Sequence, residues 1–149
     1  TGLQTCKAAG SLSSGPKGCR FGCLGFGDCV AQCKFGALSI NEFGLAQIDA
    51  DKCIGCGACA KACPRNLIAL QPVSNHTIAI ALCRNMEKGK AVRDVCMKGC
   101  ISCRLCEKNC PEGAIDCSSG VAVINPLLCK GCGICQEKCP TKAIVMHEK

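Results

Sequence analysis

The spacing of the cysteines constrains this chain more than any other feature of its sequence. Twenty of its 149 residues are cysteine. In three runs, three cysteines follow one another at steps of three, a fourth comes four residues later, and proline follows the fourth. Cysteines repeated at such short steps suit a metal centre better than a framework of disulfide bridges. The three runs are Cys53-Cys56-Cys59-Cys63, Cys100-Cys103-Cys106-Cys110 and Cys129-Cys132-Cys135-Cys139.

A fourth cysteine group departs from this spacing. It lies ahead of the first regular run, and Lys34 stands where the regular runs have proline. We interpret it as a fourth site of the same kind with a widened loop. The widening is rich in Gly and Phe, which fits either a surface for a redox partner or a shield that keeps water from the metal centre. The group consists of Cys19, Cys23, Cys29 and Cys33, with three, five and three residues between them.

The regular runs match a bacterial pattern in which three cysteines hold one [4Fe–4S] cluster and the fourth holds the partner cluster. Glycines between the cysteines permit sharp turns that point backbone N–H groups at the sulfurs. A zinc-binding structural module is the alternative. Zinc ribbons, however, use two separated C-x2-C pairs and not three cysteines in series. The sequence therefore predicts four [4Fe–4S] clusters with crossed ligands. The predicted sets are Cys19, Cys23, Cys29 and Cys63; Cys53, Cys56, Cys59 and Cys33; Cys100, Cys103, Cys106 and Cys139; and Cys129, Cys132, Cys135 and Cys110.

The segments between the cysteine groups repeat as well. Residues 37–49 and 114–125 each read as a short strand, a glycine turn and a second strand. Between them lies an insert with a strand candidate at 77–82 and a helix candidate at 87–98. We predict an α+β fold of two tandem bacterial-type two-cluster ferredoxin domains. The expected parts are a loop or truncated upstream segment over 1–18 with a flexible stretch at 10–16, a first domain over 19–70, the insert over 71–99, which contains the domain boundary, and a second domain over 100–149.

Four cysteines lie outside the predicted ligand sets. Cys117 falls opposite Ile40 when the two units are aligned, which favours a buried apolar thiol. We interpret Cys83 and Cys96 as plain thiols, and two ligands of a further cluster are the alternative. Cys6 is a candidate for pairing with residues outside this chain.

The rest of the sequence argues against several other classes of protein. Trp and Tyr are absent, which disfavours a stacking platform for nucleic-acid bases, and cluster thiolates would offset the formal net charge of +7. No run is apolar enough to span a membrane well. We find no phosphate-binding loop or catalytic triad motif, and we expect His76 and His147 to be solvated. A cluster with four cysteine ligands leaves no iron open to a substrate, so one-electron transfer is the expected function.

Two segments resemble the B subunit of the Rnf electron-transport complex. One is the run Pro16-Lys17-Gly18-Cys19-Arg20-Phe21-Gly22-Cys23-Leu24-Gly25-Phe26-Gly27-Asp28-Cys29-Val30. The other is the insert, from Cys83-Arg84-Asn85 through Lys88-Gly89-Lys90 to Cys96-Met97-Lys98-Gly99-Cys100-Ile101-Ser102-Cys103. The chain is similar to the C-terminal ferredoxin-like part of that subunit over essentially its whole length.

The resemblance implies an electron-relay subunit, itself non-catalytic, of an ion-translocating ferredoxin:NAD+ oxidoreductase complex. The implied partners are the other membrane subunits, with soluble ferredoxin as electron donor, and the coupling ion is Na+ or H+. The implied location is the cytoplasmic face of the cell membrane, through an anchor that this chain lacks. Lys34 departs from the usual proline and puts the exit geometry of the first group in question. A free-standing soluble polyferredoxin is the alternative.

Overall fold

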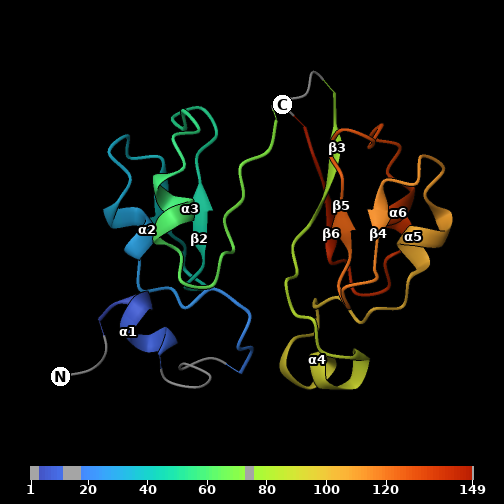
Figure 1. Ribbon diagram of the computed structural model, residues 1–149, viewed down its shortest axis with the longest axis horizontal. Helices are drawn as coiled ribbons and strands as arrows, with labels where there is room; N and C mark the ends of the chain where they lie inside the picture. The colour runs from blue at the N-terminus through green and yellow to red at the C-terminus, as the bar shows by residue number, and fades with distance from the viewer. Residues whose placement is uncertain (1–3, 12–17, 73–75, 149) are drawn as a thin grey trace. The chain divides into compact units, whose positions relative to one another are not determined.

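The computed structural model describes residues 4–11, 18–72 and 76–148. The chain divides into two compact units, Thr1–Leu70 and Gln71–Lys149, and the insert over 71–99 belongs to the second. Short helices and two-stranded antiparallel sheets alternate along the chain (Figure 1). The architecture is α+β, as the sequence predicts.

The first unit combines three short helices with one hairpin in its described part. Helix α2 (Asp28–Ala31) carries the third cysteine of the first group, and α3 (Ala58–Ala62) carries the third cysteine of the next. The two helices pack against each other. Strands β1 (Leu38–Ile40) and β2 (Ala46–Ile48) pair with each other, so the predicted strand, turn and strand over 37–49 are confirmed.

Helix α1 (Cys6–Gly10) lies in the segment over 1–18 that the sequence analysis predicts to be a loop. The Asp28 carboxylate accepts hydrogen bonds from the N–H groups of Cys6, at 2.8 Å, and Lys7, at 3.0 Å. This carboxylate satisfies two of the N–H groups that a helix leaves unpaired at its start. The predicted flexible stretch over 10–16 lies mostly outside the described residues.

The second unit contains the insert and a second hairpin. Strand β3 (Ile78–Ala81) and helix α4 (Gly89–Val95) confirm the strand and the helix expected within the insert. Helices α5 (Leu105–Asn109) and α6 (Ile134–Lys138) pack against each other, and each carries the third cysteine of a group. Strands β4 (Ile115–Asp116) and β5 (Val123–Ile124) form the second predicted hairpin.

The two hairpins lead into the following cysteine group by the same hydrogen bonds. In each unit, the residue that directly follows the hairpin makes two backbone hydrogen bonds. Its N–H donates to the carbonyl oxygen at the start of the hairpin, and its carbonyl oxygen accepts from the N–H of the first cysteine of the next group. The first bonds are Asp49 N to Ala37 O and Asn125 N to Ala114 O, both 2.8 Å, and the second are Cys53 N to Asp49 O and Cys129 N to Asn125 O, both 3.1 Å.

Strand β6 (Ile144–His147) closes the second unit by pairing antiparallel with β3, with Ala81 opposite Ile144. Ile144 is only 2% exposed and belongs to the main apolar core of this unit. A smaller apolar cluster in the first unit consists of Cys6, Ala9 and Leu24. The buried members of the main core are Ile78, Ala79, Cys106, Ala114, Ile115, Cys117, Ala122, Cys129, Cys135 and Ile144.

Candidate iron–sulfur cluster sites

All four cysteine loops turn in the same way just before their third cysteine. Residues four and two positions before that cysteine have positive φ, and the second of them caps a helix of four or five residues. Glycine adopts such angles without strain, and six of these eight residues are glycine. The pairs are Gly25 and Gly27, Gly55 and Gly57, Ser102 and Arg104, and Gly131 and Gly133, with φ between 58° and 82°.

This backbone pattern corrects the widened-loop interpretation of the first group. Cys23 stands six residues before Cys29, which is the distance from the first to the third cysteine of every regular run. Phe26 therefore takes the place of the middle cysteine, between two glycines of positive φ. The additional thiol is Cys19, which lies ahead of the common loop.

Gly131 shows that one of these turns requires glycine for space as well as for φ. Its φ is +72°, and a Cβ added there would lie against the backbone carbonyl oxygen of Thr77. The approach of the loop to this backbone therefore depends on the missing side chain.

The fourth cysteine of each group begins a second common turn. The residue three positions later has positive φ in all four groups, at Gly36, Asn66, Gly113 and Lys142. The backbone N–H four positions later points at the sulfur in the three regular runs. These bonds are Leu67 N to Cys63 Sγ at 3.5 Å, Ala114 N to Cys110 Sγ at 3.4 Å and Ala143 N to Cys139 Sγ at 3.3 Å.

Lys34 does not alter this exit turn. Backbone N–H groups of Phe35 and Ala37 point at the Cys33 sulfur and lower the pKa of that thiol. The doubt that the sequence raised about the missing proline therefore does not apply to the geometry around Cys33. A sulfur that accepts several N–H bonds is favoured in its anionic form, which is the form that binds iron.

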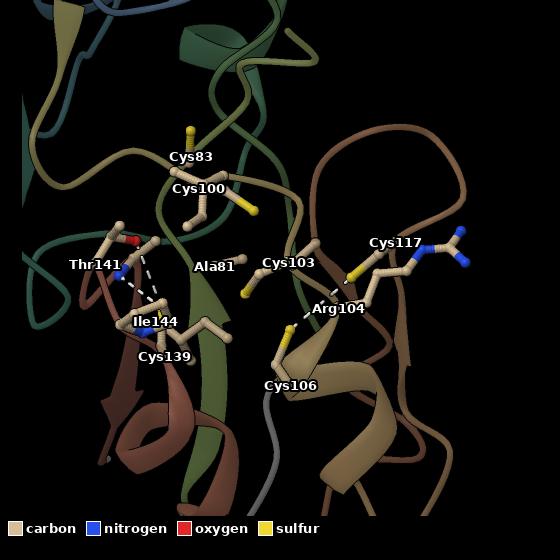
Figure 2. Close-up of a pocket in the computed structure, with 14 residues that line it drawn as sticks. Ala81, Cys83, Cys100, Cys103, Arg104, Cys106, Cys117, Cys139, Thr141 and Ile144 are labelled. Carbon is tan, nitrogen blue, oxygen red and sulfur yellow. Dashed lines mark hydrogen bonds between the residues drawn. The ribbon is translucent and has the colours of Figure 1, made fainter. Parts of the chain in front are cut away.

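The first of two cysteine-lined hollows in the second unit brings together a predicted set. It spans about 400 Å³, including space open to solvent, and is lined by Cys100, Cys103, Cys106 and Cys139 (Figure 2). Burial favours a raised pKa for the Cys139 thiol, but hydrogen bonds from Ala143 N–H and from Thr141 outweigh it and lower that pKa. Three cysteines of one run and the fourth of the other thus face one volume.

The second hollow mirrors the first. It spans about 340 Å³, including space open to solvent, and its cysteines are Cys129, Cys132, Cys135 and Cys110. Its remaining lining is largely apolar and includes Ala79 of β3. Burial raises the pKa of the Cys135 thiol.

In the first unit, the structure gathers the first cysteine group around helix α1 and the exit turn of Cys63. Burial is the main cause that raises the pKa of Cys29, and the nearby thiols Cys23 and Cys6 add to it. Arg65, two residues after Cys63, donates from Nη1 to the carbonyl oxygens of Cys19, at 3.1 Å, and Gly22, at 2.6 Å. This guanidinium ties the extra segment of the first group to the turn that presents Cys63.

The cysteines differ in burial by their position in the loop. The middle cysteines Cys56, Cys103 and Cys132 are exposed. The third cysteines Cys29, Cys106 and Cys135 are buried, whereas Cys59 is half-buried. Each loop therefore presents its middle position to solvent, and in the first group that position is Phe26, which is 36% exposed.

The four cysteines outside the predicted sets lie in different surroundings. Cys83 lines the first hollow, but its sulfur accepts from Asn85 N at 3.4 Å and turns away from the other labelled thiols in Figure 2. Cys6 is buried in α1, and Cys96 follows α4. Cys117 is buried, as expected, and burial followed by the neighbouring Cys106 raises its pKa to about 12.

Both histidines are exposed, as expected for solvated side chains, and His76 also makes a contact within the second unit. His76 is exposed, but its Nε2 lies 2.8 Å from the backbone carbonyl oxygen of Cys129. The bond ties the start of β3 to a cysteine loop. Across the described ranges 4–11, 18–72 and 76–148, no three His, Cys, Asp or Glu side chains converge closely enough to hold a single metal ion.

Comparison with protein families agrees with this loop geometry. Residues 19–68 and 52–114 match families described as 4Fe-4S dicluster domains, and residues 122–145 match a family described as a 4Fe-4S binding domain. The chain therefore belongs to the class of ferredoxins with several [4Fe–4S] domains. The donor set fits that group, because sixteen cysteines recur in four loops that point N–H groups at sulfur.

Within that class, the chain is homologous to B subunits of Rnf-type ion-translocating complexes. It is 44% identical over 143 residues to the B subunit of the ion-translocating oxidoreductase complex of Methanosarcina acetivorans, which covers 96% of this chain and 53% of the relative. The B subunit of the Na(+)-translocating ferredoxin:NAD(+) oxidoreductase complex of Acetobacterium woodii is 43% identical over 66% of this chain and 29% of its own length. The proton-translocating counterpart of Clostridium ljungdahlii is 45% identical over 86% of this chain and 44% of its own length.

The chain thus spans between about a third and about half of the length of these relatives. Within the described parts of the chain, none of the helices has both the length and the apolar character needed to cross a bilayer.

Proposed function

We propose that the chain is the electron-relay part of a subunit in an Rnf-type ion-translocating ferredoxin:NAD+ oxidoreductase complex. It passes single electrons through four [4Fe–4S] clusters and receives them from soluble ferredoxin. The observation that carries the proposal is the pair of hollows in the second unit, each lined by three thiols of one run and one thiol of the other. Homology to B subunits of such complexes over up to 96% of the chain supports the assignment to a complex.

The proposed ligand sets are crossed within each unit. The two hollows support the sets of the second unit directly, and the shared loop and exit turns extend the same arrangement to the first. We assign Cys19, Cys23, Cys29 and Cys63 to one cluster; Cys53, Cys56, Cys59 and Cys33 to a second; Cys100, Cys103, Cys106 and Cys139 to a third; and Cys129, Cys132, Cys135 and Cys110 to a fourth.

The residues of each loop have separate roles in this proposal. The buried third cysteines Cys29, Cys106 and Cys135 hold their clusters from the interior side. In the three regular loops, the exposed middle cysteine brings the redox centre close to the surface where electrons enter and leave. Backbone N–H groups at the exit turns stabilise negative charge on the fourth sulfur, which favours the reduced state. A bound [4Fe–4S] cluster supplies one-electron transfer.

The proposal also places the chain in its cell. We infer that it works at the cytoplasmic face of the cell membrane with the membrane subunits of the complex. The names of the relatives identify subunits of Na(+)-translocating and proton-translocating complexes. The same names include ferredoxin, which is the electron donor in this proposal.

The test uses anaerobically purified chain and membranes that carry the remaining subunits of the complex. We expect the chain to sediment with these membranes but not with membranes that lack the complex, and to be reduced by reduced ferredoxin. Failure to sediment at every salt concentration, together with reduction by ferredoxin, would instead identify a free-standing polyferredoxin. A chain that ferredoxin cannot reduce would contradict the relay role.

A further inference from the structure

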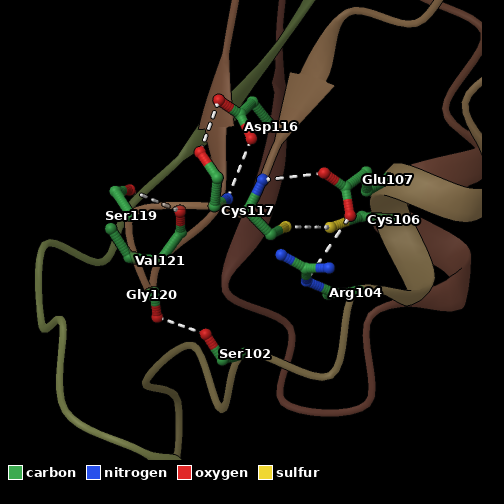
Figure 3. Close-up of polar contacts among 10 residues, drawn as sticks. Ser102, Arg104, Cys106, Glu107, Asp116, Cys117, Ser119, Gly120 and Val121 are labelled. Atoms are coloured by element: carbon green, nitrogen blue, oxygen red, sulfur yellow. Dashed lines mark hydrogen bonds and ion pairs between the residues drawn. The ribbon is translucent and has the colours of Figure 1, made fainter.

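Cys117 lies beside one of the proposed cluster ligands without belonging to a ligand set. It follows strand β4, is 3% exposed, and its Sγ lies 3.9 Å from the Sγ of Cys106 (Figure 3). It also lines the first hollow, on the same side as Cys106. The sulfur of Cys106 therefore has a buried thiol as its neighbour.

The backbone around Cys117 holds this contact in place. The N–H of Cys117 donates to Glu107 Oε1 at 3.1 Å, and Glu107 directly follows Cys106 in helix α5. The other carboxylate oxygen, Glu107 Oε2, lies 3.7 Å from Arg104 Nε (Figure 3). The residue that follows β4 is thus joined to the helix that carries Cys106 by a hydrogen bond next to the two sulfurs.

The equivalent position of the first unit is apolar. Ile40 ends strand β1 where Cys117 follows β4, and its side chain lies against the place of Gly27, the residue that caps α2. Gly27 corresponds to Arg104, since each stands two residues before a third cysteine. In the first unit, the position equivalent to Cys117 is therefore occupied by Ile40 and carries no thiol. The cysteine equivalent to Cys106 in that unit is the buried Cys29.

The chemistry of the two sulfurs in the loaded protein differs. An iron-bound cysteine is a thiolate and can only accept a hydrogen bond, whereas a buried thiol outside the ligand set keeps its proton and can donate. A hydrogen bond to a ligand sulfur offsets negative charge and favours the reduced, more negative cluster. We propose that Cys117 donates an S–H hydrogen bond to the ligand sulfur of Cys106 and thereby raises the reduction potential of the cluster at Cys100, Cys103, Cys106 and Cys139. The inference rests on the ligand set proposed above, and Cys117 acts only through Cys106.

The test is an anaerobic redox titration of the full chain, followed by EPR, with iron and sulfide counted in every sample. Cys117→Val removes the donor at nearly constant volume, and Cys117→Ser retains a donor. Ile40→Val is the matched control at the equivalent position of the first unit. A Cys106→Ser sample identifies which reduction step belongs to this cluster.

We expect Cys117→Val to keep its full iron content and to lower the equilibrium constant for reduction of that one step by about fivefold. At 59 mV per tenfold for one electron, this is a fall of about 40 mV. Cys117→Ser should recover at least half of the shift, and Ile40→Val should move no step by more than about 10 mV, which is less than a twofold change in the equilibrium constant.

Two results would overturn the inference without affecting the proposed function. The first is an unchanged potential in a fully loaded Cys117→Val protein. The second is loss of about four iron atoms from both Cys117 variants, which would make Cys117 itself a ligand. If instead the unaltered chain holds no cluster that depends on Cys106, the ligand set fails, and the proposed function fails with it.

Discussion

The two units build the same cysteine loops on different amounts of apolar packing. In the second unit, β3 pairs with β6 over an extended core that includes Ile144. In the first unit, residues 68–71 correspond to β6 but form no strand, and the buried cluster consists of Cys6, Ala9 and Leu24. The two units therefore share the geometry of their cysteine loops although their apolar cores differ in size. The first unit therefore depends more on its clusters for stability.

The units also differ at the surface of one site. Three loops present an exposed middle cysteine, whereas the loop before Cys29 presents Phe26. Because phenylalanine stands in that place, the additional thiol of the first group is Cys19, which lies ahead of the loop.

The largest expected effect comes from removal of iron. Complete chelation should leave most of the chain unprotected from hydrogen exchange, because little apolar area is available to hold it together. The first unit should lose protection completely, and the amides of β3 and β6 should retain more than those of β1 and β2. Mass spectrometry of exchanged peptides measures this. Equal protection of both sheets after iron removal would refute the comparison.

The next largest effect is the loss of one cluster in Cys63→Ser. We expect about four iron atoms fewer per chain, because the crossed ligand leaves an incomplete set. The remaining EPR signals should match those of Cys29→Ser and differ from those of Cys59→Ser. Cys83→Ser is the control and should keep its full iron content. A match to Cys59→Ser instead would disprove crossed ligation.

A smaller effect is the difference in stability lost when one apolar side chain is truncated in each unit. Ile144→Ala should lower the free energy of unfolding of the loaded protein by about 2–5 kcal/mol, because it opens a cavity in a fully buried position. Ile68→Ala changes the equivalent, half-buried residue of the first unit and should cost roughly half as much. Anaerobic denaturant unfolding followed by circular dichroism measures both. Equal costs would mean that the first unit has a core that matches the second.

The smallest effect concerns the guanidinium that holds the first loop. Arg65→Ala removes two hydrogen bonds to backbone carbonyls and should destabilise the loop by about 1–2 kcal/mol. One cluster should then bleach several-fold faster in the presence of a chelator. Arg65→Lys should fall in between, since lysine cannot reproduce the planar fork. The exposed Arg93→Ala is the control, and an equal rate in Arg93→Ala and Arg65→Ala would contradict this role for Arg65.

Much of the fold could be predicted because its signals are local. Alternating apolar residues around glycine predicted both hairpins, and the apolar run at 77–82 predicted β3. Helix α1 was missed because Asp28, more than twenty residues away, satisfies its first N–H groups. The pairing of β3 with β6 joins residues far apart in sequence, which no local pattern reports.

The first cysteine group shows what counting cysteines misses. Its cysteine spacing suggests a widened loop, whereas the positions of its glycines align residues 23–29 with the loops of the regular runs. Gly25 and Gly27 stand before Cys29 as Gly55 and Gly57 stand before Cys59, and the printed sequence already contains that signal. The contact of Cys117 with Cys106 could not be predicted in the same way, because it depends on how β4 packs on α5.

The measurement that tests the central claim most directly is the iron and acid-labile sulfide content of anaerobically purified chain. Four [4Fe–4S] clusters on sixteen cysteines require about sixteen iron and sixteen sulfide per chain. We predict that result, with all four sites filled, including the one at Phe26. Colourless protein that contains zinc and no sulfide would contradict the account.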